Sequence, residues 1–350
     1  MKLLIIILTL TSFSFTEEAQ SQSAKEIINR ALSLAGSRAD SALKILDEAF
    51  LKDANPDFIY NKATILYSKR KFDMAIDELG KIIDIENSRD DYFRLLGACY
   101  DLLGNKPKAK QTLGDGLEKF PKSGKLYYEL GVIEIGDSKL NEALKMWSKG
   151  VYSEPIFPGN YFYLAKYSKN KVHSIIYSEF YLNLSASQRK TKEISAYLYG
   201  IYSDIFEQYK NRKDIELYPE ISSDDEENMK FAFERTYHSV ALQCLKELNI
   251  TQTSLESINK FRILFLRKWL ADNYNIHYPV APIDYQESVQ KKGHLRSYNY
   301  LILSEGNRKE LDDFIKTNKN SLQKYAKWSM SNGFKVNNLN SFYPNKFDQD

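Results

Sequence analysis

The chain has 350 residues, of which 43% are hydrophobic, so it can fill the cores of about two compact domains and is not a disordered chain. Its 49 basic and 46 acidic residues are interleaved and leave a net charge of +3, so the charge pattern gives no indication of a nucleic-acid partner. The 25 tyrosines and 19 phenylalanines suit a packed helical array and a binding face equally well, and composition alone does not separate these uses.

The N-terminal segment places Lys2 before an apolar run from Leu3 to Phe15, which polar residues follow. The run is too short to span a bilayer and predicts a secretory signal peptide over residues 1–21. The small residues Ala19 and Ser21 favour cleavage after Ser21. Cleavage after Ser14 is the rival site, and a buried N-terminal helix is the alternative structure. We therefore expect a secreted protein, in the periplasm or associated with the outer membrane of a Gram-negative bacterium.

Cysteine usage adds little to this picture. No cysteine lies near the expected cleavage site, so the acceptor for the lipid of a bacterial lipoprotein is missing. Cys99 and Cys244 are far apart in the sequence, and we expect both to be buried thiols.

From residue 56 the sequence repeats with a period of 34 residues. The unit that begins at Asp90 has an aromatic residue at place 4, Leu-Gly at places 7 and 8, alanine at place 20 and proline at place 32. The units from Pro56 and Gly124 keep the same phase without an insertion. Their matching residues are Ile59, Ala63, Ala75, Phe93, Leu96, Gly97, Ala109, Pro121, Tyr127, Leu130, Gly131, Ala143, Trp147 and Pro155.

This pattern closely resembles the tetratricopeptide repeat, in which each unit is a pair of antiparallel helices. The resemblance covers residues 22–187 as about five hairpins, strongest over 56–157. A degenerate unit begins at Pro158, and another precedes Pro56 with Ala42 and Ala49 at its alanine places. Glu134 and Lys62 depart from the pattern, as do Gly116 and Gly150. The resemblance implies an all-α solenoid, wound as a right-handed superhelix, with a C-terminal helical domain after it.

Four glycines between Leu95 and Pro121 raise the alternative of a phosphate-binding loop. Such a loop needs Gly-x-x-x-x-Gly-Lys-Ser/Thr between a strand and a helix, and these glycines have neither that spacing nor a preceding strand. Gly97 and Gly131 instead sit where paired helices cross most closely, opposite the alanine at place 20. Gly104 is expected to take the left-handed conformation that ends a helix.

Beyond Ser187 the repeat is lost, but helical periodicity continues. We expect a helical domain over 188–332 and an irregular tail over 333–350. One amphipathic helix is predicted from Lys190 to about residue 212. Capping boxes predict helix starts at Ser223, with Glu226, and at Thr253, with Glu256. Prolines interrupt residues 275–283, and a glycine turn at Gly293 separates two short helices. The final helices are predicted from about Lys309 to Ser331.

No catalytic motif is recognisable, so we expect no enzymatic activity, cofactor or metal. The four histidines are scattered, without a pair at zinc-binding spacing, and neither cysteine lies in the signature of a catalytic thiol. No Gly-x-Ser-x-Gly motif occurs.

The resemblance to tetratricopeptide proteins implies that places 2, 5, 9 and 12 of each unit face a bound segment in the concave groove. The residues expected to bind a partner are Tyr60, Thr64, Tyr67, Arg94, Ala98, Asp101, Tyr128, Val132, Ile135, Phe162 and Lys166. The lysine and asparagine with which some relatives grip a terminal carboxylate are absent. Aromatic residues with one arginine are typical of interaction hot spots, although the same rings could pack against neighbouring helices.

The sequence therefore predicts a non-catalytic scaffold of the cell envelope that binds a protein or peptide, with no nucleic acid and no transmembrane span. The alternative is a small-molecule or glycan-binding module in the C-terminal helices. Its aromatic residues would be Trp269, Tyr274, His277, Tyr278 and Tyr285, around the proline-containing loop.

Overall fold

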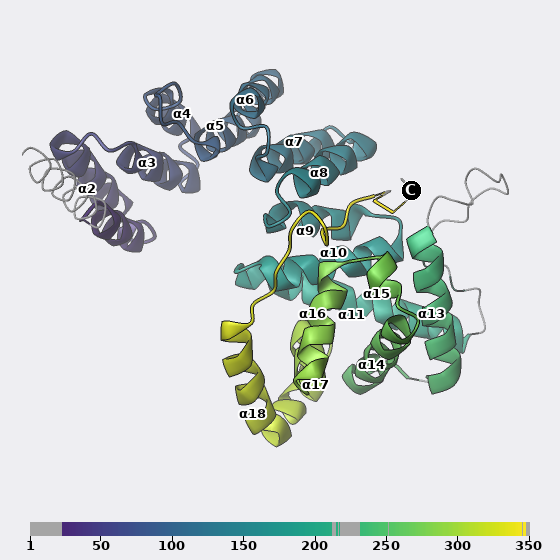
Figure 1. Ribbon diagram of the computed structural model, residues 1–350. Coiled ribbons are helices and arrows are strands. Elements are labelled where there is room, and N and C mark those ends of the chain that lie inside the picture. Colours follow the sequence, from purple (N-terminus) through teal and green to yellow (C-terminus); the bar gives the residue numbers. More distant parts are fainter. Residues whose placement is uncertain are drawn as a thin grey trace, which may run out of the picture. The chain divides into compact units, whose positions relative to one another are not determined.

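The computed structural model describes residues 23–211, 215, 217, 232–250, 252–344, 346 and 347. Over these residues the protein contains helices and no strands (Figure 1), as the all-α prediction requires. The signal peptide predicted over 1–21 and the capping box predicted at Ser223 lie outside the described residues. The chain divides into two compact units after Pro121. This division falls inside the predicted repeat array; the boundaries predicted at residues 187 and 332, and the superhelix, stay predictions.

The first unit consists of helices that pack in sequence order. Residues 23–34 are helical. They are followed by α2 (Ala39–Lys52), α3 (Pro56–Ser68), α4 (Phe72–Gly80), α5 (Asp90–Leu102) and α6 (Lys106–Lys119). The alanines expected in the degenerate first hairpin, Ala42 and Ala49, are buried in α2.

The second unit begins with a further hairpin and continues through the C-terminal helices. Its helices are α7 (Gly124–Gly136), α8 (Leu140–Ser153), α9 (Pro158–Tyr167), α10 (Lys171–Leu184), α11 (Gln188–Lys210), α13 (Ala232–Leu248), α14 (Leu255–Ala271), α15 (Tyr274–His277), α16 (Ala281–Lys291), α17 (Leu295–Ile302) and α18 (Arg308–Ser331).

The period of 34 residues appears directly in the backbone. The helices α3, α5, α7 and α9 begin at Pro56, Asp90, Gly124 and Pro158, as the repeat predicts. Place 15 of the first three units has a positive φ, at Arg70, Gly104 and Ser138. The backbone N–H after each of these residues donates to a carbonyl five residues earlier, at 2.9, 2.9 and 3.0 Å. The hairpins are therefore tetratricopeptide-type repeats, and Gly104 is the left-handed cap that was expected.

The two key glycines are packing residues, and the side chain nearest to each of them is at place 24 of the same unit. A Cβ on Gly97 would lie 2.7 Å from Leu113 Cγ, and a Cβ on Gly131 would lie within 2.6 Å of the Trp147 ring. Leu113 and Trp147 occupy place 24, whereas the prediction named the alanine at place 20. The nearest atoms come from place 24 because a large side chain there fills the space above the glycine backbone.

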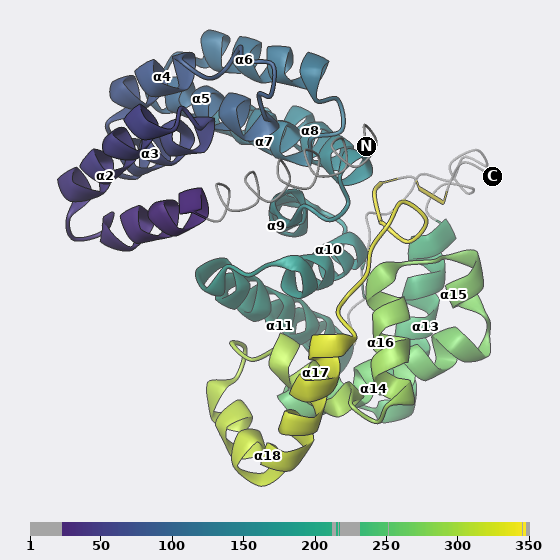
Figure 2. The same ribbon diagram turned by 60° about the vertical axis from the view of Figure 1, so that its left-hand side comes forward.

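One continuous hydrophobic core runs through the second unit from Ala143 in α8 to Phe342 in the tail. After α18 the tail passes α16 (Figures 1 and 2), where Ala281 N–H donates to the Asn340 carbonyl at 2.8 Å. Phe342 is 2% exposed, with its ring centroid 5.1 Å from those of both His173 and Phe233. The predicted irregular tail is thus irregular in backbone and yet supplies a core side chain.

Most of the helix boundaries expected after Ser187 are confirmed. The helix α11 matches the predicted amphipathic helix, and Gly293, with a φ of 74°, separates α16 from α17. The capping box at Thr253 is wrong by one residue: Ser254 is the N-cap and exchanges hydrogen bonds with Ser257. Glu256 instead accepts from Tyr300 Oη at 2.8 Å.

Candidate partner-binding site

On the first unit, the predicted residues of α3 and α5 form one surface, here called the unit-1 face. The side chains of Tyr60, Thr64 and Tyr67 follow one another at helical spacing on α3, whose start is fixed by Asn55 accepting from Asp57 N–H at 2.9 Å. Arg94 on α5 donates to Tyr60 Oη at 3.5 Å. These four side chains are half-buried, as is Asp101. Place 5 of one hairpin therefore adjoins place 5 of the next.

The unit-1 face carries paired charges beside aromatic rings. The Arg89 guanidinium lies 5.4 Å from the Tyr60 ring centroid and 5.0 Å from that of Tyr92, and it pairs with Asp57 at 2.7 Å. Arg94 pairs with Asp91 at 3.5 Å. Burial raises the pKa of Tyr92. This arrangement offers a partner aromatic surface and hydrogen-bond donors without a large excess of either charge.

Lys62, which departs from the repeat pattern, is part of a structural ion-pair network below this face. Its ammonium lies 2.5 Å from Asp47 and 3.0 Å from Glu78, so it joins α2, α3 and α4. Burial opposes its charge, but the hydrogen bonds with Asp47 and Glu78 outweigh burial and raise the pKa of Lys62. Burial likewise opposes the charge of Glu78, while bonds from Lys81 and Lys62 lower the pKa of that carboxyl.

Replacing Lys62 by methionine is expected to lower the free energy of unfolding by about 1.5 kcal/mol near pH 7, because Glu78 loses a charged hydrogen-bond partner in a largely buried place. The pKa of Glu78 is lowered on folding, so its contribution is present above about pH 4.5 and is lost as the pH falls further. The difference between Lys62→Met and the native chain should therefore shrink in acid. Urea unfolding at several pH values measures it, and Lys44→Met, at an exposed pair with Glu48, is the control that should change little.

On the second unit, the predicted residues of α7 and α9 surround an aromatic cluster, here called the unit-2 face. The Tyr163 ring centroid lies 5.6 Å from that of Tyr128 and 5.2 Å from that of Phe162. Trp147 stacks on Tyr163 at 4.7 Å with an interplanar angle of 8°. Tyr128 and Val132 are half-buried, but Phe162 is 5% exposed. The Phe162 ring therefore serves packing more than contact with a partner.

A lysine that the sequence did not single out completes the unit-2 face. Lys190 Nζ, from the first turn of α11, lies 4.7 Å from the Phe162 ring centroid and donates to Tyr128 Oη at 3.5 Å. Burial lowers the pKa of Lys190. Lys166 on α9 is exposed and pairs with Glu193 on α11. One feature of the sequence could have indicated Lys190. Arg189, Lys190 and Lys192 form a run of cations at a helix start, where the helix dipole disfavours positive charge.

The aromatic residues of the alternative binding module do not share a site. Trp269 is fully buried, stacked on Phe265 at 5.6 Å, and both Tyr274 and Tyr278 pack against it. His277 is exposed and bonds the Asn273 carbonyl. Tyr285 lies elsewhere and packs against Trp328.

The described residues hold little that indicates catalysis. Cys99 and Cys244 are buried, as expected, and burial raises the pKa of the Cys244 thiol to about 12. His173 bonds Glu234 within the core, next to Phe342. Over the same residues, no group of three or more His, Cys, Asp or Glu side chains is placed to hold a metal ion. No helix among them has both the length and the apolar character needed to cross a membrane.

Comparison with known proteins finds similarity among solved structures alone. No protein-family model matches the chain, and no curated protein sequence matches it. TTC0263, a thermophilic TPR protein of Thermus thermophilus, is 14% identical, with a TM-score of 0.42 over 51% of this chain and 98% of that one. MamA 41-end from Desulfovibrio magneticus RS-1 is 18% identical, with a TM-score of 0.34 over 47% of this chain and 93% of that one.

A tetratricopeptide repeat protein from Parabacteroides merdae ATCC 43184 is also similar. It is 14% identical, with a TM-score of 0.35 over 81% of this chain and 99% of that one. The repeat type of this protein is carried by its own backbone, through the 34-residue spacing of helix starts and the recurring left-handed residue at place 15.

Proposed function

We propose that this protein is a non-catalytic scaffold that binds a partner protein or peptide through its tetratricopeptide hairpins. It acts in the envelope of a Gram-negative bacterium after export by its N-terminal signal peptide, in the periplasm or at the outer membrane. The residues proposed to line the partner-binding surface are Tyr60, Thr64, Tyr67, Arg94 and Asp101 on the first unit, and Tyr128, Val132, Phe162 and Lys166 on the second. Of these, the half-buried residues of the unit-1 face contribute most, and Phe162 contributes by supporting its neighbours.

One observation carries this proposal. The side chains at places 5, 9 and 12 of α3 lie in line and half-exposed, and Arg94 at place 5 of α5 reaches Tyr60 at 3.5 Å. Large aromatic rings and an arginine held rigidly on helices lose little conformational freedom when a partner binds, which favours affinity. Thr64 Oγ1 donates to the Tyr60 carbonyl at 3.0 Å, so the hydroxyl proton between the rings already has a partner within the helix.

Site-specific photo-crosslinking in intact cells tests the proposal. A photoreactive residue in place of Thr64 on α3 is expected to capture a discrete partner in the envelope fraction, and Tyr60→Ala with Arg94→Ala should reduce this product at least tenfold, as loss of two hot-spot side chains does. The matched control places the photoreactive residue at Met74 on α4, which is 50% exposed in the second helix of the same hairpin. Equal capture from Thr64 and Met74, or a product confined to the cytoplasm, would contradict the proposal.

A further inference from the structure

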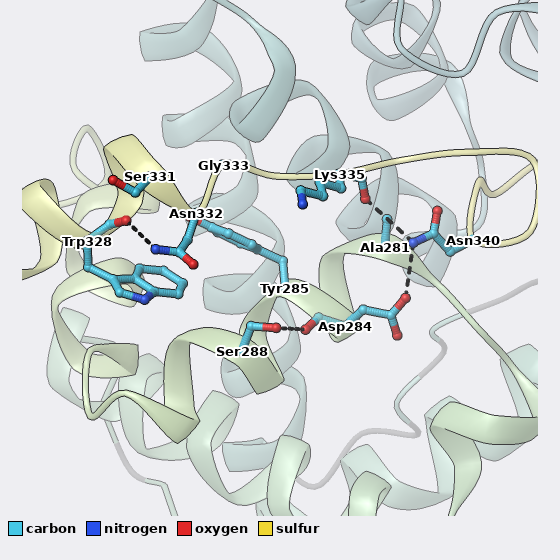
Figure 3. A pocket seen from close by; sticks show the side chains of 10 residues that line it. All are labelled: Ala281, Asp284, Tyr285, Ser288, Trp328, Ser331, Asn332, Gly333, Lys335 and Asn340. Carbon is cyan, nitrogen blue, oxygen red and sulfur yellow. Dashed lines mark hydrogen bonds between the residues drawn. The ribbon is translucent and has the colours of Figure 1, made fainter.

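A pocket of about 250 Å³ lies between α16, the end of α18 and the tail (Figure 3). In this view the Trp328 and Tyr285 rings lie at one end, and the Asp284 carboxylate lies with Asn340 at the other. This volume suits one small ring-shaped ligand.

The aromatic end of the pocket is a firm apolar platform. The Tyr285 and Trp328 ring centroids are 6.1 Å apart at an interplanar angle of 31°. Tyr285 is wedged edge-on against Tyr298 at 5.6 Å and Phe334 at 5.7 Å, and Trp328 also contacts His294 at 5.8 Å. Tyr285 and Trp328 are both half-buried, so part of each ring stays open to a ligand. A platform of this kind fits the apolar C–H face of a saturated six-membered ring.

Internal hydrogen bonds hold the side chains of the polar end in place and leave some of their acceptor atoms available to a ligand. Asn340 Nδ2 donates to Asp284 Oδ2 at 3.2 Å, which leaves the second carboxylate oxygen as an acceptor. Asn332 Nδ2 donates to the Trp328 carbonyl at 2.9 Å, which leaves its amide oxygen. Ser288 Oγ donates to the Asp284 carbonyl at 3.0 Å and can still accept. These side chains need little reorganisation on binding.

The tail that forms one wall is anchored by a half-buried lysine. Lys346 Nζ donates to the carbonyls of Leu339 at 2.7 Å and Ser341 at 2.6 Å. It also donates to the Pro279 carbonyl at 3.2 Å, just before α16. The wall that carries Lys335 and Asn340 is therefore tied to the helix that carries Asp284 and Tyr285.

The charges of the lining select against an ionic ligand. Asp284 supplies one negative charge and Lys335, whose side chain is exposed, supplies one positive charge. An organic cation would be repelled by Lys335, and an organic anion would be repelled by Asp284. A neutral ligand with several hydroxyls can accept from Lys335 and donate to Asp284 and Asn332 at once.

We infer that this pocket binds one hexopyranose ring, with its C–H face on Trp328 and Tyr285 and its hydroxyls on Asp284, Asn332 and Lys335. This activity is separate from the scaffold function and uses no residue of the unit-1 or unit-2 face. The ring is a free hexose or the terminal residue of a glycan. A hexose has about twelve non-hydrogen atoms. At the binding free energy per atom that is usual for small ligands, it should bind with a Kd of about 1 mM.

Tryptophan fluorescence of the full chain tests the inference, because the protein has three tryptophans and two of them, Trp147 and Trp269, are fully buried. Titration with glucose, galactose, mannose and N-acetylglucosamine is expected to give a saturable change for at least one sugar, with a Kd of about 1 mM. Binding of the methyl glycoside as tight as that of the free sugar identifies a glycan terminus, and binding of the reducing sugar alone identifies a free hexose.

Variants decide whether the signal comes from this pocket. Asp284→Asn should weaken binding about tenfold or more, because a charged hydrogen bond is lost, and Lys335→Met should weaken it without touching an internal bond. Asp312→Asn, an exposed carboxylate on α18 outside the pocket, should leave the affinity unchanged. Circular dichroism confirms that each variant is folded. The inference fails if no sugar saturates the signal, if tetramethylammonium does so instead, or if both pocket variants bind like the native chain.

Discussion

Gly131→Ala is expected to lower the free energy of unfolding of the second unit by about 1–3 kcal/mol. The new Cβ would lie 2.5 Å from Trp147 Cδ1 and 2.6 Å from Cε2, and closer still to Nε1. The indole cannot move away easily, because it is fully buried, stacks on Tyr163, and donates from Nε1 to the Tyr128 carbonyl at 3.2 Å. Overpacking of this kind costs about 1–3 kcal/mol, and loss of the indole hydrogen bond adds about 1 kcal/mol. The better helix propensity of alanine returns about 1 kcal/mol.

The matched control is Gly200→Ala, in the middle of α11 of the same unit. A Cβ there meets no atom within 4 Å, and the residue is exposed. Alanine should therefore stabilise the unit by about 0.5–1 kcal/mol through helix propensity alone. Urea unfolding followed by circular dichroism measures both variants. If both substitutions changed the free energy of unfolding equally, helix propensity and not close packing would explain the effect at Gly131.

The repeat could be predicted from the sequence because its cause is local and periodic. Each hairpin needs a small residue at place 8, a left-handed residue at place 15 and a helix stop near place 32, so the starts at Asp90 and Gly124 could be located to the residue. The partner of Gly131 was harder to foresee, since alanine and tryptophan at places 20 and 24 both lie on the inner face of α8. The volume of the tryptophan decides which of them covers the glycine.

The candidate site was predicted less completely, because it depends on contacts between residues that are far apart in the sequence and follow no regular spacing. Lys190 reaches the unit-2 face from a helix outside the 34-residue phase. Phe342 enters the core from an asparagine-rich tail whose aromatic residues follow no helical or strand periodicity. The pocket beside Trp328 brings Asp284 and Asn340 together across 56 residues. In each case tertiary packing, and not local preference, sets the position of the side chain.

Tertiary packing also positions a buried polar network at the centre of the second unit. Arg262 Nη1 on α14 donates to Glu179 Oε1 on α10 at 2.5 Å and to Tyr202 Oη on α11 at 2.9 Å. Its Nε donates to Asn299 Oδ1 on α17 at 2.8 Å, and Gln286 on α16 donates to the other oxygen of Glu179 at 2.7 Å. Burial opposes the charge of Arg262, but Glu179 outweighs burial and holds the pKa of the guanidinium well above its usual range. One side chain and its partners thus join five helices.

Arg262→Met is expected to lower the free energy of unfolding by about 3–5 kcal/mol, because the Glu179 carboxyl, 3% exposed, would lose its cation and one hydrogen-bond donor in the core. The double variant with Glu179→Leu should be less destabilised than the sum of the single variants, since it removes both charges together. Arg296→Met on α17 is the control: its pair with Glu256 is 52% and 40% exposed and should contribute less than about 1 kcal/mol. A double-mutant cycle by urea unfolding measures the coupling. A coupling near zero would mean that Arg262 acts by volume alone, and the network would then be incidental to the packing of the five helices.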